Sequence, residues 1–410
     1  MRVSKGVVQI DMVLPRPRDS IAQPGRGGLW SGCGLSGSRR SDRENSPQKS
    51  EVCLEMRAVT LAGPLLPGSV LTTMPSPLAH AGAATADHLL AQVAVALQAP
   101  DIRPYRKLHP FWPGIDYVIR MQSPKPGAHV LIQALTHGNE LCGAIALDYL
   151  MRASIRPERG VLSLVFANIE AYRRWNPEQP HANRYCDEDY NRVWSDEVLN
   201  STRDSIELRR ARTLRAYIDS ADFLLDLHSM SSPCEPLMVC GVREGGGLKA
   251  VDLSRALGLP KWLMMDTGHA AGLRMIERGA FGDPQAPAVA VLLEAGQHWE
   301  EGTAQVAIDL SLRFLAHTGA VSEAWAQARC VLPPVEQRVI QVTEAVTAQS
   351  LDFVWLGDYQ GLEIVPDQGT AVARDGAISI CTPYPDCVLV MPTRARFAPG
   401  QTMLRFGRLL

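Results

Sequence analysis

The sequence lacks several features that would assign it to a specialised class of protein. Its 43 acidic and 41 basic residues leave a formal net charge of −2, so no charge excess favours nucleic acid or an anionic membrane. It has no uncharged apolar run of membrane-spanning length. The Gly-rich stretch at 244–247 lacks the lysine and spacing of a phosphate-binding loop. We therefore expect neither nucleic acid nor a membrane as a partner.

The cysteines also lack the pattern of a disulfide framework or a thiolate metal site. There are nine, an odd number, and they are scattered without any CxxC pair. In a chain of this length they are typical of the reduced thiols of a cytosolic protein, so we expect a cytoplasmic location. Cys142 and Cys186 have no histidine paired with them in the sequence pattern, which favours structural thiols over nucleophiles.

Residues 1–73 differ from the rest of the chain in composition. They are rich in Pro, Gly, Ser and Arg and show no lasting hydrophobic period. Such a segment cannot bury enough apolar surface to offset its ordering entropy, so we expect it to be disordered or to be an extension preceding the true start. Met56 and Met74 are candidate starts. A weaker alternative is a secretory signal after Met56, because two prolines and two glycines interrupt its apolar core.

Residues 87–334 alternate between apolar runs and helical patterns, which indicates an α/β fold. Strands are expected at "HVLIQAL", "VLSLVFAN", "DFLLDLH" and "AVAVLLEAG", with amphipathic segments between them. Continuous apolar strands of this kind favour a mainly parallel, mixed sheet with helices on both faces. Residues 335–410 instead contain short β-rich runs punctuated by Gly, Pro and Asp, and we expect a small β-rich C-terminal domain there.

Acidic and imidazole side chains stand where three of these strands end. His137 and Glu140 follow the first strand, His228 ends another and Glu294 ends a third. Ligands bind at the carboxyl ends of strands in open α/β sheets, so these residues should converge. Two imidazoles and one carboxylate form a three-ligand catalytic zinc site with one open position. His137, Glu140 and His228 would hold one zinc ion per chain, and Glu294 would serve as the general base.

A second polar cluster, "NRYCDEDYNRVW", covers residues 183–194. Arg184 and Arg192 could hold a carboxylate bidentately or stabilise an oxyanion. Asp189 could orient a zinc-binding histidine from behind. Asn191 completes the cluster. On chemistry alone, surface charges in a polar loop are about as well supported as these functional roles.

Four motifs in order resemble the succinylglutamate desuccinylase and aspartoacylase family. They are "HGNE" at 137–140, "RYCDEDYNR" at 184–192, "DLH" at 226–228 and "LEAG" at 293–296. Members of this family are zinc amide hydrolases related to zinc carboxypeptidases. The resemblance covers roughly residues 105–410. It implies that His137, Glu140 and His228 are the zinc ligands, that Glu294 activates water, and that Arg184 polarises the scissile carbonyl.

The same resemblance implies how substrate is bound. Asn191 and Arg192 would grip the substrate carboxylate, and Asp189 would support the first zinc histidine. The chain departs from the family after His228 and after Glu294, where "SMSSPCEPLMVCG" and "AGQHW" do not follow the usual pattern. Unlike aspartoacylase, it also has no arginine in "GDPQAPAVAVLL", immediately before Glu294. Arg274 and Arg278 lie farther upstream. We therefore expect tolerance of N-acyl amino acids without an acidic side chain.

The resulting hypothesis is zinc-dependent hydrolysis of the amide bond of an N-acyl amino acid. One alternative is a zinc carboxypeptidase that removes a C-terminal residue, since both substrates are amides with a nearby carboxylate. Pocket depth separates these two, because a β-rich domain over the cleft would exclude long peptides. Another alternative is a non-catalytic metal-binding or ligand-binding protein of this fold. The presence of Glu294 argues against it, since a binding protein needs no base.

Other polar residues are expected to be structural. His181, His269 and His298 match no motif, and buried or surface histidines of this kind are usually structural. Asp226 lies two residues before His228 on the same side of a strand. It could support that histidine from behind or simply form a strand-end hydrogen bond, and the sequence leaves both possibilities open.

Overall fold

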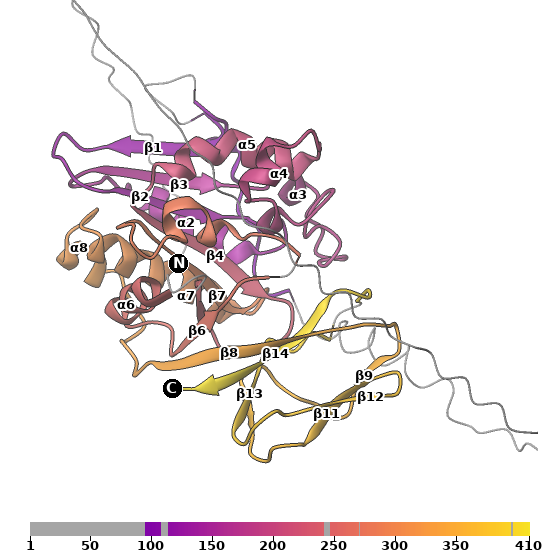
Figure 1. The fold of residues 1–410 in the computed structure, drawn as a ribbon. Coiled ribbons are helices and arrows are strands. Elements are labelled where there is room, and N and C mark those ends of the chain that lie inside the picture. The colour runs from indigo at the N-terminus through magenta and orange to yellow at the C-terminus, as the bar shows by residue number, and fades with distance from the viewer. Residues whose placement is uncertain (1–94, 108–113, 242–246, 270, 395–396) are drawn as a thin grey trace, which may run out of the picture. The chain divides into compact units, whose positions relative to one another are not determined.

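The computed structural model describes residues 95–107, 114–241, 247–269, 271–394 and 397–410 (Figure 1). The expected disorder of residues 1–73 concerns a segment outside these ranges. Within them, no helix combines the length and the apolar character needed to cross a bilayer.

The described strands follow the apolar runs of the sequence. They are β1 (Val118–Gln122), β2 (His129–Ala134), β3 (Val161–Phe166), β4 (Phe223–Met230), β5 (Leu237–Gly241), β6 (Trp262–Asp266), β7 (Val289–Gln297), β8 (Arg338–Thr347), β9 (Phe353–Trp355), β10 (Glu363–Val365), β11 (Ala371–Asp375), β12 (Ile378–Cys381), β13 (Cys387–Val390) and β14 (Thr402–Leu409). The helices are α2 (Leu141–Arg152), α3 (Ile169–Arg173), α4 (Asp196–Asn200), α5 (Ile206–Asp219), α6 (Gly247–Leu257), α7 (Glu301–His317) and α8 (Glu323–Gln327), with short 3-10 turns η1 (Arg103–Tyr105), η2 (Tyr190–Arg192), η4 (Met275–Glu277) and η5 (Gly279–Phe281).

The described strands form one large mixed sheet and one small sheet. The order in the large sheet is β1-β3-β2-β4-β7-β5-β6-β8-β14-β13-β10, and the small sheet has the order β12-β11-β9. Neighbours are parallel from β3 through β2 and β4 to β7. The direction reverses at β5, which is antiparallel to β7 but parallel to β6. The predicted mainly parallel, mixed α/β fold is thus confirmed.

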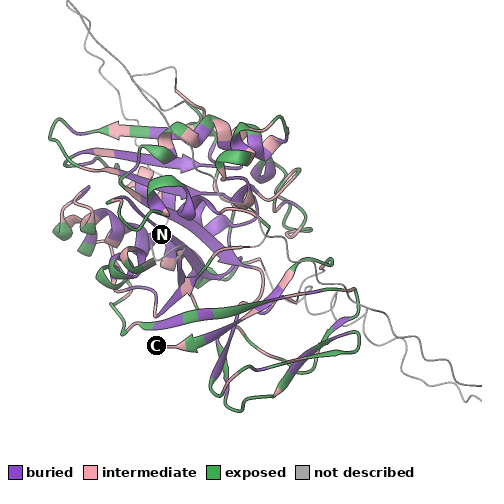
Figure 2. Cartoon of the chain, viewed as in Figure 1, coloured by how far each residue is buried: buried purple, intermediate pink, exposed green. Residues whose placement is uncertain are grey.

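Helices cover both faces of the large sheet, and alternate strand residues point to different helices. On one face, Leu227 and Leu293 belong to the hydrophobic cluster that includes residues of α2, α6 and α7. On the other face, Leu224 and Leu292 share a cluster with residues of α5. Both β4 and β7 are buried along nearly their whole length (Figure 2). Because side chains alternate along a strand, His228 and Glu294 face the same side as Leu224 and Leu292, which is the α5 side.

The C-terminal strands continue the large sheet. β8 pairs with β6 in parallel, and β14 pairs with β8 on its other side. Ile340 of β8 and Val388 of β13 belong to the same hydrophobic cluster as Trp262 and Met264 of β6. A second cluster, around Phe353 and Phe406, lies within residues 346–406. The β-rich region therefore has a core of its own and also shares one with the preceding sheet.

Candidate active site

The "HGNE" motif forms the tight connection between β2 and α2. The chain leaves β2 through Leu135, which has a left-handed φ of 60°, and α2 begins immediately after Glu140. A Cβ atom at Gly138 would lie 2.5 Å from the backbone of Ala171 and 2.6 Å from that of Asn183, so glycine is required for this close approach. The Gly138 N–H also donates to the Arg184 carbonyl at 2.9 Å. The first motif is thus bound directly to the second.

The three predicted zinc ligands lie together and are buried. Each of His137, Glu140 and His228 offers a ligating atom, and these atoms lie within 4.8 Å of one another. The Nδ1 atom of His137 is 2.7 Å from Oε1 of Glu140, and the Nδ1 atom of His228 is 2.9 Å from Oε2. Strand β4 and the β2–α2 turn therefore bring together two imidazoles and one carboxylate that are 91 positions apart at their extremes, from 137 to 228.

Each histidine also has a carboxylate on its far side. Nε2 of His137 lies 3.1 Å from Oδ1 of Asp189, and Nε2 of His228 lies 2.8 Å from Oδ2 of Asp226. When an imidazole is neutral, the carboxylate behind it can accept the Nε2–H, and the Nδ1 lone pair on the Glu140 side is then available to a cation. The two possibilities for Asp226 are thereby decided geometrically, because it contacts the histidine itself.

The donor set fits a divalent cation of the zinc type. Two nitrogen donors and one carboxylate with an open side are the usual composition of such a site. Oε2 of Glu140 is buried and makes no hydrogen bond of good geometry to any described residue, despite its closeness to His228. Burial raises the pKa of Glu140, but the charges of His137 and His228 outweigh burial and hold that pKa well below its usual value. The carboxylate is therefore ionised and available as a ligand.

Glu294 lies beside this cluster in the neighbouring strand. In the register of β4 and β7 it is the direct partner of His228. Its side chain is buried, and Oε2 has no hydrogen-bond partner among the described residues. Burial raises the pKa of Glu294 to about 8; His228 opposes this shift, whereas Glu140 adds to it. A buried carboxylate with a raised pKa, adjacent to a metal-ligand cluster, has the properties of a general base.

The segment from Arg184 to Arg192 closes one side of the cluster. The Arg184 guanidinium donates to Oε1 of Glu140 at 3.4 Å and to Oδ2 of Asp189 at 3.3 Å, and it stays half-exposed. The Arg192 guanidinium lies 4.0 Å from the same Asp189 oxygen and donates to the Asn191 carbonyl at 2.8 Å. Asn191 holds the loop before η4, since its side-chain oxygen accepts the Met275 N–H at 3.1 Å.

Sequence reasoning missed the residue that fixes this segment. Glu207, in the first turn of α5, is fully buried and accepts the consecutive N–H groups of residues 186–188, at 2.6, 3.0 and 3.3 Å. It also accepts the side-chain amide of Asn168 at 2.9 Å. In the sequence, a glutamate early in a helix looks like an ordinary capping residue. The sequence therefore gives no signal for the contact between Glu207 and residues 186–188.

Two further arginines near Arg192 were also missed as neighbours of the site. Arg274 is buried and bound to Asp266 at 2.8 Å and to Glu277 at 2.6 Å. Arg405, on β14, lies 3.5 Å from Asp266. Both add positive potential at Arg192. Arg278, in contrast, binds carboxylates of α4 and α5. The absence of an arginine immediately before Glu294 therefore does not leave Arg192 without cationic neighbours.

The remaining histidines have local partners. His298 is buried, with its Nδ1 atom 2.8 Å from the Ser229 hydroxyl, and burial lowers its pKa to about 3. His181 packs edge-on against Trp299. His269 approaches β14, and its Nε2 atom lies 3.4 Å from the Thr402 hydroxyl.

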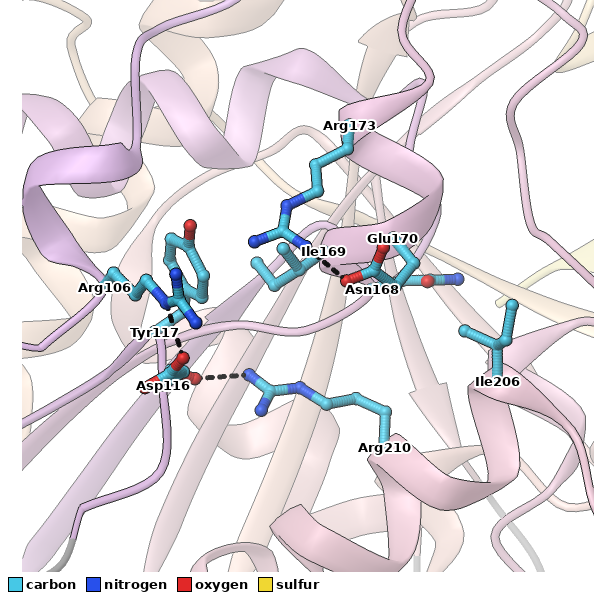
Figure 3. Close-up of a pocket in the computed structure, with 9 residues that line it drawn as sticks. All are labelled: Arg106, Asp116, Tyr117, Asn168, Ile169, Glu170, Arg173, Ile206 and Arg210. Atoms are coloured by element: carbon cyan, nitrogen blue, oxygen red, sulfur yellow. Dashed lines mark hydrogen bonds and ion pairs between the residues drawn. The ribbon is translucent and has the colours of Figure 1, made fainter.

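A separate pocket shares no residue with this cluster (Figure 3). Its cationic side chains are bound by acceptors of other lining residues: Arg106 and Arg173 by the carboxylates of Asp116 and Glu170, and Arg210 by the main-chain carbonyl of Asp116 at 3.0 Å. We assign no function to this pocket.

Comparison with known proteins agrees with the motif pattern. The profile of the succinylglutamate desuccinylase/aspartoacylase catalytic domain matches residues 126–318, which contain both histidines, Glu140 and Glu294. Over this stretch, just under half of the chain, the sequence is similar to the catalytic domain of that family. The resemblance inferred from the four motifs is thus confirmed.

Two curated relatives are similar over part of their length. A probable aspartoacylase of Parasynechococcus marenigrum is 36% identical over 141 residues, which is 33% of this chain and 45% of the relative. An N-acyl-aromatic-L-amino acid amidohydrolase (carboxylate-forming) of Rattus norvegicus is 31% identical over 133 residues, or 30% of this chain and 40% of the relative. The chain thus spans less than half the length of either curated relative.

Solved structures share the fold over a longer stretch. Succinylglutamate desuccinylase from Vibrio parahaemolyticus has a TM-score of 0.52 at 17% identity, covering 72% of this chain and 86% of that one. An aspartoacylase family protein from Mesorhizobium loti has a TM-score of 0.51 at 19% identity, covering 72% and 88%. At these identities the likeness concerns the fold, and the activity rests on the site itself.

Proposed function

We propose that the protein is a zinc-dependent hydrolase of the amide bond of N-acyl amino acids. The observation that carries this proposal is the buried cluster of His137, Glu140 and His228, with Glu294 directly beside it. A metal-binding protein without catalysis would gain nothing from a buried carboxylate of raised pKa at that position. Similarity to the catalytic domain of a family that includes amide hydrolases supports the same reaction class.

The protein's own residues account for the proton transfers. Glu294 takes a proton from the attacking water as the new C–O bond forms, and it then gives the proton to the amide nitrogen as the C–N bond breaks. The products are a carboxylic acid and a free amino acid. Zinc held by His137, Glu140 and His228 would supply Lewis-acid polarisation of the reacting oxygen atoms.

The two arginines would act on different parts of the substrate. Arg184 lies against the ligand Glu140 and keeps an exposed side, so it can donate to the oxygen that becomes negative in the transition state. Arg192 is more deeply buried, lies farther from the metal ligands and would bind the carboxylate of the amino acid. Asn191 supports this arrangement by fixing the loop at Met275.

The decisive experiment is a substrate screen with the zinc-loaded protein. N-acetyl and N-succinyl derivatives of acidic, neutral and aromatic amino acids are scored for released amine, with N-blocked dipeptides as carboxypeptidase substrates. Hydrolysis of N-acyl amino acids that disappears in Glu294→Gln supports the proposal. Preferential cleavage of the dipeptides would identify a carboxypeptidase instead, and no hydrolysis of either class by metal-loaded protein contradicts the proposal.

A further inference from the structure

Three guanidinium groups meet at the side of the site that the C-terminal strands border. Arg192 comes from η2, Arg274 from the start of η4, and Arg405 from β14, where it pairs with Ala345 of β8 and Val390 of β13. They lie 213 positions apart at their extremes, from 192 to 405, so only the fold brings them together. Burial is the main cause of the lowered pKa of Arg192, and repulsion from Arg184, Arg274 and Arg405 adds to it.

The carboxylates of this region do not match the three cations equally. Both terminal nitrogens of Arg274 are held by carboxylates, Asp266 at 2.8 Å and Glu277 at 2.6 Å, although its buried Nε makes no hydrogen bond to a described residue. Among the described carboxylates, the one within 4.0 Å of Arg405 is Asp266, whose Oδ2 lies at 3.5 Å and is already held by Arg274. The Nε atom of Arg405 is also buried and makes no hydrogen bond to any described residue. A buried guanidinium donor without an acceptor is costly, so this geometry is suited to an incoming anion.

Arg192 is also weakly paired. Its guanidinium lies 4.0 Å from Asp189, and that carboxylate is already shared with Arg184 and His137. His269, near these arginines, carries no charge at neutral pH. Burial lowers its pKa to about 4, and the three arginines add to this effect, so its imidazole is neutral at pH 7. Arg192 and Arg405 are therefore weakly paired, because each lies 3.5–4.0 Å from a carboxylate that another arginine already contacts.

Arg405 is electrostatically linked to the reaction centre as well. Its guanidinium interacts with Glu294, the proposed base, and with Arg192, the proposed carboxylate ligand. Its side chain is 11% exposed and therefore largely withdrawn from solvent. On the same strand, Arg408 is exposed and stacks over Tyr384 instead.

We propose that Arg405 is a specificity-determining residue, which supplies a second carboxylate-binding guanidinium to the substrate pocket from the C-terminal strand β14. The proposal rests on the proposed function, since it concerns which amides are accepted. A substrate with one carboxylate at Arg192 and another at Arg405 would satisfy both cations. The second carboxylate belongs either to the amino-acid side chain or to the acyl group. This contact would replace the arginine that the sequence lacks before Glu294.

The first test compares substrates that differ only in this charge. N-acetylglutamate is set against N-acetylglutamine, and N-succinylalanine against its half-amide N-succinamoylalanine, for wild-type protein, Arg405→Gln and the control Arg408→Gln. The wild type and the control should prefer one of the charged members. In Arg405→Gln, KM for that substrate should rise about 10–100-fold while kcat changes little, because a charge-assisted contact to bound substrate is lost. Which pair responds tells whether the second carboxylate is on the side chain or the acyl group.

Equal rises in KM for charged and uncharged substrates would overturn the assignment, as would no preference in the wild type. Arg405→Lys provides a second variant if the glutamine variant fails to fold. Lysine retains the positive charge near Asp266 but lacks the planar guanidinium that can donate two hydrogen bonds to one carboxylate. This variant should show a smaller, still charge-selective rise in KM, and an unselective rise would contradict the proposal.

The second test measures binding without turnover. Titration calorimetry with succinate and with its half-amide, succinamate, is performed on the same variants. Succinate should bind more tightly than succinamate to the wild type and to Arg408→Gln, with the difference lost in Arg405→Gln. If that pattern appears but no amide is hydrolysed, the proposed function fails and the role of Arg405 stands. If amides are hydrolysed but all variants bind both probes alike, Arg405 has no such role.

Discussion

At the residue scale, the carboxylate behind each imidazole decides what the site can bind. Asp226 lies 2.8 Å from Nε2 of His228, and Glu140 lies on the other side of the ring. Burial lowers the pKa of His228, but Asp226 and Glu140 outweigh burial and raise that pKa well above its usual value. Without metal, His228 therefore keeps its proton at neutral pH, and a cation must displace that proton to bind.

Asp226→Asn should weaken zinc binding about 10–100-fold, because the amide is a poorer acceptor and no longer fixes the ring or increases its basicity. The affinity is measured by competition with a chelating dye. Asp204→Asn, at an exposed position in the same part of the chain, is the control and should bind zinc like the wild type. Equal affinity in the two variants would show that Asp226 does not support a metal ligand.

Glu294→Gln should reduce hydrolysis about 10²–10⁴-fold while zinc is retained, because glutamine cannot accept the proton. In metal-free protein burial raises the pKa of Glu294 to about 8, whereas the same carboxyl in the unfolded chain has its ordinary pKa of 4.5. Between these pH values only the unfolded chain releases the proton, so wild-type stability falls as pH rises through this window. The variant lacks this loss.

The check is to measure metal content, melting temperature and rate on one preparation. Metal-free Glu294→Gln should melt higher than the wild type at pH 8, and the two should converge at acid pH. A variant that is less stable at every pH but hydrolyses at the wild-type rate would identify Glu294 as a structural carboxylate.

At the element scale, the start of α5 positions the segment that carries Arg184 and Arg192. Glu207→Gln leaves the residue's size unchanged but replaces one acceptor oxygen with a donor, facing the N–H groups of residues 186–188. We expect a loss of about 1–3 kcal/mol in unfolding free energy. Turnover per folded molecule should also fall, since Arg184 and Asp189 depend on this segment.

Glu197→Gln is the matched control, because Glu197 is an exposed glutamate in the first turn of α4. Both variants lose a negative charge in the first turn of a helix, whereas only Glu207→Gln alters the buried hydrogen bonds to residues 186–188. Chemical denaturation and steady-state kinetics separate the two effects. Equal small changes in both variants would mean that Glu207 contributes only to the helix terminus.

The elements near the site were largely predictable, but their partners were not. Apolar runs predicted β2, β4 and β7, and strand-end geometry predicted that His137, His228 and Glu294 would converge. β6 went unnoticed, because its five residues "WLMMD" offer no clear period. The reversal of direction at β5 and the approach of Arg405 depend on pairings between distant segments, and local sequence carries no signal for these.

At the scale of the whole molecule, the β-rich C-terminal region cannot be treated as an appendage. Ile340 of β8 is fully buried, pairs with Met264 of β6 and Leu409 of β14, and belongs to the cluster that includes residues of α5. The strand that carries Arg405 is thus joined to the sheet that carries Glu294 through continuous hydrogen bonding. Specificity and folding are coupled as a result, since loosening β8 would also displace Arg405.

This coupling predicts how the protein unfolds. Ile340→Ala removes a buried side chain shared by the two regions and should lower the unfolding free energy by about 2–5 kcal/mol. Ile378→Ala, in exposed β12 of the small sheet, should change it by less than about 0.5 kcal/mol. In calorimetry, Ile340→Ala should shift one common transition of residues 114–410, because β6 and β8 cannot separate without exposing that core. Two resolved transitions, with only the smaller one moved by Ile340→Ala, would mean that the C-terminal strands fold as an independent domain.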